Sequence, residues 1–272
     1  MSIQMIAVDM DGTFLDSHST YDHQAFQAIY KQLKDNHIHF VVASGNPYKQ
    51  LQNNFEEIKD ELIYIAENGG YIVDKGEELY LASINKEDSK KIISALKKMN
   101  DVLCWVCTKN QSYTLNSLSE HYYQMFLPYF PGVKRIEDFS DIHEPILKFA
   151  LYLPEKNVEE RIQDFMQIVS ENVHVVDSGH YCVDIIPSHV NKGTAIDVLM
   201  KKYHLSKDEV MTFGDANNDI EMLKRVTYGY AMANAKEEFR SQFQYIAPSH
   251  NESGVLQVIK HYLQYHTFLN IK

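Results

Sequence analysis

Short apolar runs alternate with an amphipathic segment in the first part of the chain. Residues 5–9, 39–43 and 62–66 are near-continuous apolar runs, which are typical of strands buried on both faces of a parallel sheet. Between the first two runs, residues 21–36 place apolar side chains at helical spacing, and this spacing predicts a helix. The alternation of strand and helix predicts a doubly wound parallel sheet.

The pattern changes after about residue 81. Residues 83–186 hold apolar runs and amphipathic segments that do not alternate regularly, and this order is typical of an α+β unit. The segments that predict helices are 86–99 and 158–170, and those that predict strands are 102–108, 147–153, 173–176 and 181–186.

Regular alternation returns after Pro187. The predicted helices are 192–203, 220–226 and 255–262, and the predicted strands are 210–213, 228–232 and 245–247. We therefore predict an α/β protein. Residues 1–82 and 187–272 form a Rossmann-like core around one parallel sheet, and residues 83–186 form an inserted α+β domain.

Composition narrows the class of protein. Hydrophobic residues make up 44% and charged residues 23% of the 272 residues, which is typical of a soluble globular protein. The formal net charge is −11, and the acidity is spread over both predicted parts. Neither part has the basic excess that nucleic-acid binding requires. An acidic chain repels phosphate esters at long range, so handling them requires local cations, a metal ion or oriented backbone N–H groups.

We expect neither a membrane span nor a secretory signal. No apolar run reaches the roughly 18 residues that span a bilayer, and the first residues lack the basic and apolar segments of a secretory signal. Three cysteines in so long a chain do not make a disulfide scaffold. We therefore expect a cytoplasmic protein with neither membrane nor nucleic acid as a partner.

The strongest candidate chemistry follows the first predicted strand. The segment Asp9-Met-Asp11-Gly-Thr13 places two carboxylates two residues apart before a glycine. Ligands of open parallel sheets bind beyond the carboxyl ends of the strands. Two carboxylates at such a place are costly unless a cation or a proton compensates them. The alternative is a turn or helix cap built from Asp and Gly, but four fixed residues directly after a buried strand rarely arise by chance.

A second group of acids and amides follows the predicted strand 210–213. Residues 213–219 read Phe-Gly-Asp-Ala-Asn-Asn-Asp, and a helix is predicted to begin directly afterwards. A helix start favours anions and carboxylates. This segment therefore predicts a second part of the same site, with helix capping as the alternative.

Two further signals are weaker when each is taken alone. The turn Ser44-Gly45 follows the second predicted strand, and its hydroxyl and backbone N–H groups can receive phosphate oxygens. An ordinary turn is the alternative. Lys192 begins a predicted helix, where a cation is mildly unfavourable because the dipole prefers anions. An anion bound between the lysine and the helix start would offset this unfavourable interaction. The alternative is a lysine on the surface, solvated by water.

Together these four segments resemble the haloacid dehalogenase-like superfamily of phosphohydrolases. The match is closer still to its Cof-type subfamily, which carries a large α/β (type IIB) cap inserted between the second and third motifs. Residues 221–223, 231–235 and 253–255 are similar to the C-terminal signature of that subfamily. The resemblance therefore covers nearly the whole chain, and it implies that residues 83–186 are a substrate-selecting cap domain.

The resemblance also implies roles for the acidic residues. Asp9 resembles the nucleophile that attacks phosphorus and forms an aspartyl-phosphate. Asp11 resembles the acid that protonates the leaving alcohol and the base that later activates water. Asp215, the carboxylate of Asp9 and the backbone carbonyl of Asp11 would hold Mg²⁺, which suits a hard ion that prefers oxygen ligands.

The resemblance also implies which residues bind the substrate and which hold the site together. Ser44, Gly45, Lys192 and Asn218 would contact the phosphoryl group or the substrate. Thr13 and Asp219 would support the site, with Asp219 orienting neighbours such as Lys192.

One position departs from the family pattern. Asn46 stands where the subfamily usually has arginine, so a bidentate guanidinium is lost from the phosphate or substrate. This change puts the affinity for substrate, or its identity, in doubt.

Two features of the inserted domain have simpler interpretations. Cys104 and Cys107 form a C-x-x-C segment without a second cysteine pair. On a strand, residues i and i+3 face opposite sides, so we expect two core cysteines. The aromatic residues of 122–130 could line a substrate pocket, but we expect most of them to pack inside the domain.

We therefore predict a Mg²⁺-dependent phosphatase that hydrolyses a small phosphorylated metabolite. The resemblance alone places sugar phosphates first, ahead of nucleotides and pyridoxal phosphate. Its partner is the small-molecule phosphate ester, and the protein is a monomer or homodimer. Two alternatives stay open. One is a phosphomutase or other phosphotransferase, and the other is a non-catalytic metabolite sensor, which only Asn46 supports.

Overall fold

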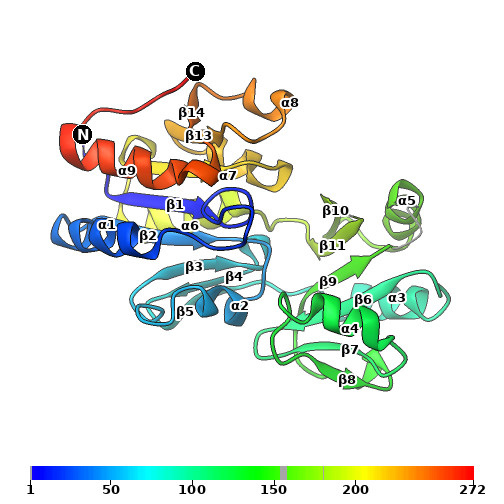
Figure 1. Cartoon of the computed structure of the whole chain (residues 1–272). Coiled ribbons are helices and arrows are strands. Elements are labelled where there is room, and N and C mark those ends of the chain that lie inside the picture. Colours follow the sequence, from blue (N-terminus) through cyan, green and yellow to red (C-terminus); the bar gives the residue numbers. More distant parts are fainter. Residues whose placement is uncertain (1, 154–157, 180) are drawn as a thin grey trace. The chain divides into compact units, whose positions relative to one another are not determined.

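The chain forms two compact units. The computed structural model describes residues 2–153, 158–179 and 181–272. The core unit contains the residues up to Gly45, Glu57–Glu78 and Asn191–Lys272, and the second unit contains Asn46–Glu56 and Leu79–Val190 (Figure 1). The sequence predicted a division near residues 82 and 186, whereas the structure also groups the segment Asn46–Glu56 with the second unit.

An eight-stranded sheet forms the centre of the core unit. Its strands are β1 (Met5–Asp9), β2 (His39–Ala43), β3 (Ile63–Ala66), β4 (Tyr71–Asp74), β5 (Glu77–Leu81), β12 (Val210–Gly214), β13 (Tyr228–Met232) and β14 (Tyr245–Ala247). The order is β14-β13-β12-β1-β2-β3-β4-β5. The pairs from β14 to β3 are parallel, and β4 runs antiparallel to β3. The predicted parallel-sheet core is confirmed.

Helices cover both faces of this sheet. They are α1 (His23–Asp35), α6 (Lys192–Tyr203), α7 (Ile220–Lys224), α8 (Glu237–Arg240) and α9 (Gly254–Tyr265). α1 packs beside α9, whereas α6 packs beside α7 on the other side of the sheet (Figure 1). Helix α1 buries the apolar residues that the spacing predicted, and Asp22 caps its start by accepting a hydrogen bond from the backbone N–H of Ala25.

The second unit has its own six-stranded sheet. Its strands are β6 (Leu103–Thr108), β7 (Ser112–Leu115), β8 (Lys134–Ile136), β9 (Ile146–Tyr152), β10 (Val173–Gly179) and β11 (Cys182–Pro187), in the order β10-β11-β9-β6-β7-β8. The helices of this unit are α2 (Tyr48–Asn53), α3 (Lys86–Leu96), α4 (Glu120–Phe126) and α5 (Val158–Ile168). The predicted mixture of strands and helices without regular alternation is confirmed.

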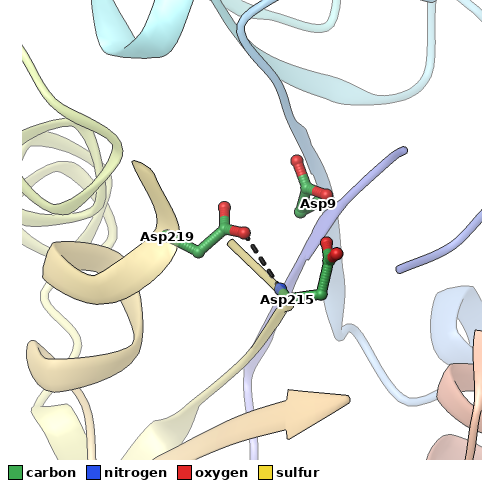
Figure 2. A group of neighbouring side chains, drawn as sticks. All are labelled: Asp9, Asp215 and Asp219. Carbon is green, nitrogen blue, oxygen red and sulfur yellow. Dashed lines mark hydrogen bonds between the residues drawn. The ribbon is translucent and has the colours of Figure 1, made fainter. Parts of the chain in front are cut away.

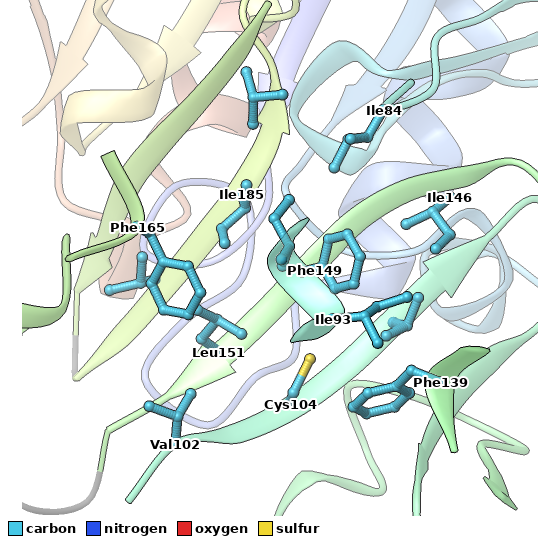
Figure 3. Close-up of a cluster of buried hydrophobic side chains, with 14 of the residues drawn as sticks. Ile84, Ile93, Val102, Cys104, Phe139, Ile146, Phe149, Leu151, Phe165 and Ile185 are labelled. Carbon is cyan, nitrogen blue, oxygen red and sulfur yellow. The ribbon is translucent and has the colours of Figure 1, made fainter. Parts of the chain in front are cut away.

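The two faces of this second sheet carry separate apolar clusters. On one face, Cys104 lies among side chains that include Ile93 of α3 and Phe165 of α5 (Figure 3); we call this the α3/α5 face. On the other face, Cys107 clusters with Trp105, and residues of α4 pack against them; we call this the α4 face. The two cysteines are buried on opposite faces, which confirms that they are core residues of a strand.

Most of the aromatic residues after position 121 pack as expected. Phe126 and Phe130 lie with ring centroids 4.4 and 5.5 Å from that of Trp105. Tyr129 differs, since 46% of its surface is exposed. The aromatic stretch is therefore mainly a core element of the α4 face.

The differences from the predicted elements have local causes. The helix predicted to reach residue 99 ends at Leu96, and the short strands β4, β5, β7 and β8 were not predicted. These strands have three to five residues, too few for a clear periodicity. No helix in the described ranges is long and apolar enough to cross a membrane.

Asp88 joins the start of α3 to the segment after α5. Its carboxylate accepts hydrogen bonds from the backbone N–H of Ser170 (3.0 Å), the Ser170 hydroxyl (2.5 Å) and the Asn85 side-chain amide (2.6 Å). Burial alone would raise the pKa of Asp88, but these hydrogen bonds outweigh burial and lower the pKa below its ordinary value. The charged form therefore ties the two helices together.

We expect Asp88→Ala to lower the free energy of unfolding by about 2–3 kcal/mol at neutral pH. Because the folded pKa lies below the unfolded one, this stabilisation is present above the ordinary carboxyl range and is lost as pH falls through the lowered pKa. The difference from wild type therefore narrows below about pH 4. Urea unfolding followed by the fluorescence of Trp105, the only tryptophan, measures both effects.

The matched control is Glu87→Ala, on the exposed side of the same helix turn. Its surface ion pair with Lys91 is worth at most about 0.5 kcal/mol. Equal losses in the two variants, or a loss at Asp88 that does not change with pH, would contradict this account.

Candidate active site

Three neighbouring strands of the core sheet deliver the candidate residues to one edge. Asp9 is the last residue of β1, Ser44 follows β2, and Asp215 follows β12. Because β1 lies between β12 and β2 in a parallel arrangement, the carboxyl ends of the three strands meet. Figure 2 shows Asp9 and Asp215 close together, with Asp219 beside them.

Lys192 is the cation at the centre of this group. It is the first residue of α6, directly after Asn191, which forms a capping box with Thr194. The side chain of Lys192 is fully buried, and its Nζ donates hydrogen bonds to Asp9 Oδ1 (2.5 Å) and Asp219 Oδ1 (2.7 Å). Lys192 is therefore not a solvated surface lysine. The anions that offset its unfavourable place at a helix start are the carboxylates of Asp9 and Asp219.

Asp219 holds the loop after β12 in place. Its second oxygen, Oδ2, accepts hydrogen bonds from the backbone N–H groups of Asp215 (3.0 Å) and Ala216 (3.1 Å). Both carboxylate oxygens are thus engaged, one by Lys192 and one by the loop backbone. Asp219 lies in the contact with Lys192 that we expected.

The segment Asp9–Thr13 holds the side chain of Asp215 in place. Its Oδ1 accepts a hydrogen bond from the Thr13 hydroxyl at 2.9 Å. Gly12 has a φ of +79°, and a Cβ placed there would lie 2.6 Å from Asp215 Oδ2. The glycine therefore permits both the turn and the close approach of the two motifs.

The charges of the site are unbalanced. Burial, together with Asp219 and Asp215, raises the pKa of Asp9 well above its ordinary value, although Lys192 acts in the opposite direction. Burial and the charge of Asp219 raise the pKa of Asp215 to about 6. Burial would lower the pKa of Lys192, but Asp219 and Asp9 outweigh it and raise that pKa. One cation does not offset three carboxylates.

The donor set fits a divalent cation. Asp9, Asp215 and Asp219 each offer one oxygen, and these oxygens lie within 4.8 Å of one another. Since both oxygens of Asp219 already receive hydrogen bonds, Asp9 and Asp215 are the carboxylates best able to hold the ion. A site made only of oxygen ligands suits a hard cation.

A second group of residues lies beside the carboxylates. Ser44 is buried, and its backbone carbonyl accepts a hydrogen bond from the N–H of Asn68 at 3.0 Å. A Cβ on Gly45 would lie 3.0 Å from Asn68 Oδ1, and the same oxygen accepts a hydrogen bond from Asn218 Nδ2 at 3.2 Å. Asn68 therefore joins the Ser44-Gly45 turn to Asn218.

Sequence reasoning missed Asn68 and another asparagine. Asn68 lies directly after β3, and nothing in the local sequence indicates a contact with Asn218. Asn234 donates a hydrogen bond from Nδ2 to the Gly12 carbonyl at 2.8 Å, and its only signal was its place in the C-terminal segment 231–235. The remaining predicted residue, Asp11, is exposed.

Comparison with known proteins now decides the family. A family model described as haloacid dehalogenase-like hydrolase matches residues 6–259. The chain belongs to the haloacid dehalogenase-like hydrolases. This finding confirms the resemblance on which the roles of the first and last motifs were based.

Individual relatives agree over almost the whole chain. A 5-amino-6-(5-phospho-D-ribitylamino)uracil phosphatase of Escherichia coli is 34% identical, over 97% of this chain and 98% of its own. The crystal structure of SMU.1108c from Streptococcus mutans UA159 matches with a TM-score of 0.90 and 36% identity, over 97% of this chain and 100% of its own.

A more distant structure supports the fold. The subclass IIB sugar phosphatase BT4131 matches with a TM-score of 0.82 and 21% identity, over 95% of this chain and 98% of its own. Together with the family match, these relatives confirm a Cof-type haloacid dehalogenase-like hydrolase. The chain is a phosphoric monoester hydrolase that acts on small phosphorylated metabolites.

We expect Gly12→Ala to lower kcat/KM for phosphate release about a hundredfold, since the added Cβ displaces the Asp215 carboxylate from its position. The control is Gly76→Ala. Gly76 also has a positive φ, +84°, but no atom of the residues that the structure describes lies within 4 Å of an added Cβ, so this variant carries the backbone strain without the collision. Equal activity of the two variants, measured with circular dichroism to verify folding, would contradict the proposed contact.

Proposed function

We propose that the protein is a Mg²⁺-dependent phosphatase that works through an aspartyl-phosphate on Asp9, with a sugar phosphate as its substrate. The observation that carries this proposal is the state of the Asp9 carboxylate. Lys192 holds Oδ1, and Oδ2 accepts no hydrogen bond from the residues that the structure describes. One oxygen is therefore oriented and the other is available for attack.

The proposed steps are those that membership of the family implies for Asp9 and Asp11. Asp9 Oδ2 attacks phosphorus, and the bond from phosphorus to the ester oxygen breaks. Asp11 gives its proton to the departing alkoxide, which leaves as the alcohol. Asp11 then takes a proton from water, the water oxygen attacks phosphorus, and the bond to Asp9 breaks to release inorganic phosphate. Asp9 and Asp11 return to their starting states.

Other residues bind and orient the phosphoryl group. Lys192 supplies a compact positive charge beside Asp9, while Ser44, Gly45 and Asn218 offer hydroxyl, backbone and amide donors. Mg²⁺ held by Asp9, Asp215 and the Asp11 backbone carbonyl would offset the repulsion between nucleophile and phosphate and the charge that develops in the transition state. Thr13 and Asp219 keep Asp215 and Lys192 in place.

We further propose that residues 83–186 act as the cap domain that selects the substrate. The name of the Escherichia coli relative describes a phosphorylated ribityl chain attached to a uracil, and a Bacillus subtilis relative, 24% identical over 97% of this chain, carries the same substrate in its name. These names support a phosphate ester on the primary alcohol of a sugar or alditol as the substrate class.

We expect Asp9→Asn to abolish phosphate release from p-nitrophenyl phosphate and from a panel of sugar phosphates, because an amide does not attack phosphorus. The loss should exceed about a thousandfold, as for removal of a nucleophile in other enzymes. Asp35→Asn, a change in an exposed surface ion pair, is the control and should retain full activity. Turnover near that of wild type in pure Asp9→Asn protein would exclude the nucleophilic role.

The metal assignment has its own test. We expect EDTA to stop phosphate release by the wild-type protein and added Mg²⁺ to restore it, whereas Asp215→Ala should stay inactive at Mg²⁺ concentrations that saturate wild type. Isothermal titration of Mg²⁺ into both proteins separates lost binding from lost chemistry. Unchanged activity in EDTA, or equal Mg²⁺ affinity in both proteins, would contradict the assignment.

A further inference from the structure

The turn after β3 in the core unit has a left-handed backbone at three consecutive residues. Glu67, Asn68 and Gly69 have φ angles of +52°, +55° and +103°. Residues other than glycine disfavour this region because the Cβ approaches a backbone carbonyl oxygen, although asparagine tolerates it better than most. Such conformations persist where the surrounding structure holds the chain in them, and they cluster at functional sites.

Asn68 contacts two of the loops that carry candidate phosphoryl-binding residues. Its backbone N–H donates a hydrogen bond to the Ser44 carbonyl at 3.0 Å, and its side-chain Oδ1 accepts one from Asn218 Nδ2 at 3.2 Å. Asn68 follows β3 and Asn218 follows β12, and these two strands are not neighbours in the sheet. Asn68 is 4% exposed, so bulk water does not compete for these hydrogen bonds.

The next residue of the turn lies against a third segment of the site. A Cβ added at Gly69 would collide with the backbone carbonyl of Asn191, which caps the start of α6 directly before Lys192. The turn thus touches each of the three segments that carry candidate phosphoryl-binding residues. These contacts account for a backbone that its residues would not adopt alone.

We propose that Asn68 is a positioning residue for phosphoryl binding, and that it acts by orienting the side-chain amide of Asn218. An asparagine amide has two N–H donors. The hydrogen bond to Asn68 Oδ1 uses one of them and fixes the plane of the amide, so that the second is directed at a phosphoryl oxygen. Binding then costs less side-chain freedom than it would for an unrestrained amide. The inference rests on the proposed function, in which Asn218 binds the phosphoryl group.

A double-mutant cycle tests this role. The variants are Asn68→Gly, which removes the acceptor and suits a positive φ, Asn218→Ala, and the two combined. In the full-length protein with Mg²⁺, isothermal titration gives the Kd of inorganic phosphate, and p-nitrophenyl phosphate gives kcat/KM. We expect each single variant to weaken phosphate binding and to lower kcat/KM about tenfold. The double variant should also lose about tenfold, because Asn68 acts only through Asn218.

Lys75→Gly is the matched control. Lys75 also has a left-handed backbone, with a φ of +51°, but it is exposed and lies beside the start of β3, at the opposite edge of the sheet. This variant should keep both quantities within twofold of wild type, and thermal unfolding verifies the folding of every variant.

A purely structural role of Asn68 would lower the unfolding temperature of Asn68→Gly and leave its phosphate Kd within twofold of the control. That result would overturn the proposal. So would an unchanged Kd in Asn218→Ala, or a loss of about a hundredfold in the double variant, since independent contributions multiply.

A second variant reaches the same amide from the side of the Ser44-Gly45 turn, and it supplies the test if Asn68→Gly does not fold. Gly45→Ala would place a Cβ 3.0 Å from Asn68 Oδ1, which should displace that oxygen from Asn218. We expect phosphate binding about tenfold weaker, with no further loss when Asn218→Ala is added. Additive losses, or a Kd within twofold of wild type, would contradict the proposal. If phosphate release proves independent of Asp9, the proposed function fails, and the phosphate titrations still decide the role of Asn68.

Discussion

The ammonium group of Lys192 is the interaction on which the site depends. It is fully buried and lies between the carboxylates of Asp9 and Asp219, which belong to segments about 200 residues apart in the chain. Without this cation, burial would favour protonation of the carboxylates. If they stayed charged, their mutual repulsion would push them apart. The lysine therefore makes it possible to bring the ends of β1 and β12 together while leaving one oxygen of Asp9 available.

The parallel sheet determines which residues can meet at that point. The neighbours β12, β1 and β2 end at the same edge of the sheet. The polar side chains at or just after these strand ends, Asp215, Asp9 and Ser44, therefore lie near one another. The capping box of Asn191 begins α6 at the position that places Lys192 in the site, and Asp219 uses its second oxygen to fix the loop that carries Asp215. Asp219 thus both pairs with the charge of Lys192 and fixes the loop that carries Asp215.

The elements and motifs that could be predicted from the sequence are those that depend on residues close together in the chain. Continuous apolar runs and helical spacing predicted Met5–Asp9 and Lys192–Tyr203 with their observed bounds. Short strands such as Ser112–Leu115 were missed, because four residues carry too little periodicity. The site motifs were found because their residues are consecutive. The link from Asn68 to Asn218 was not, since it joins residues 150 apart and depends on packing that no local pattern records.

The most direct test of this account is a crystal structure of the protein grown with Mn²⁺, which replaces Mg²⁺ at oxygen sites and is located by its anomalous scattering. The account predicts one ion bound by Asp9 and Asp215, with Asp219 still hydrogen-bonded to Lys192 and not in contact with the metal. An ion held by Asp219, with Lys192 displaced from it, would contradict the role given to that lysine. So would density that shows no ion at this edge of the sheet.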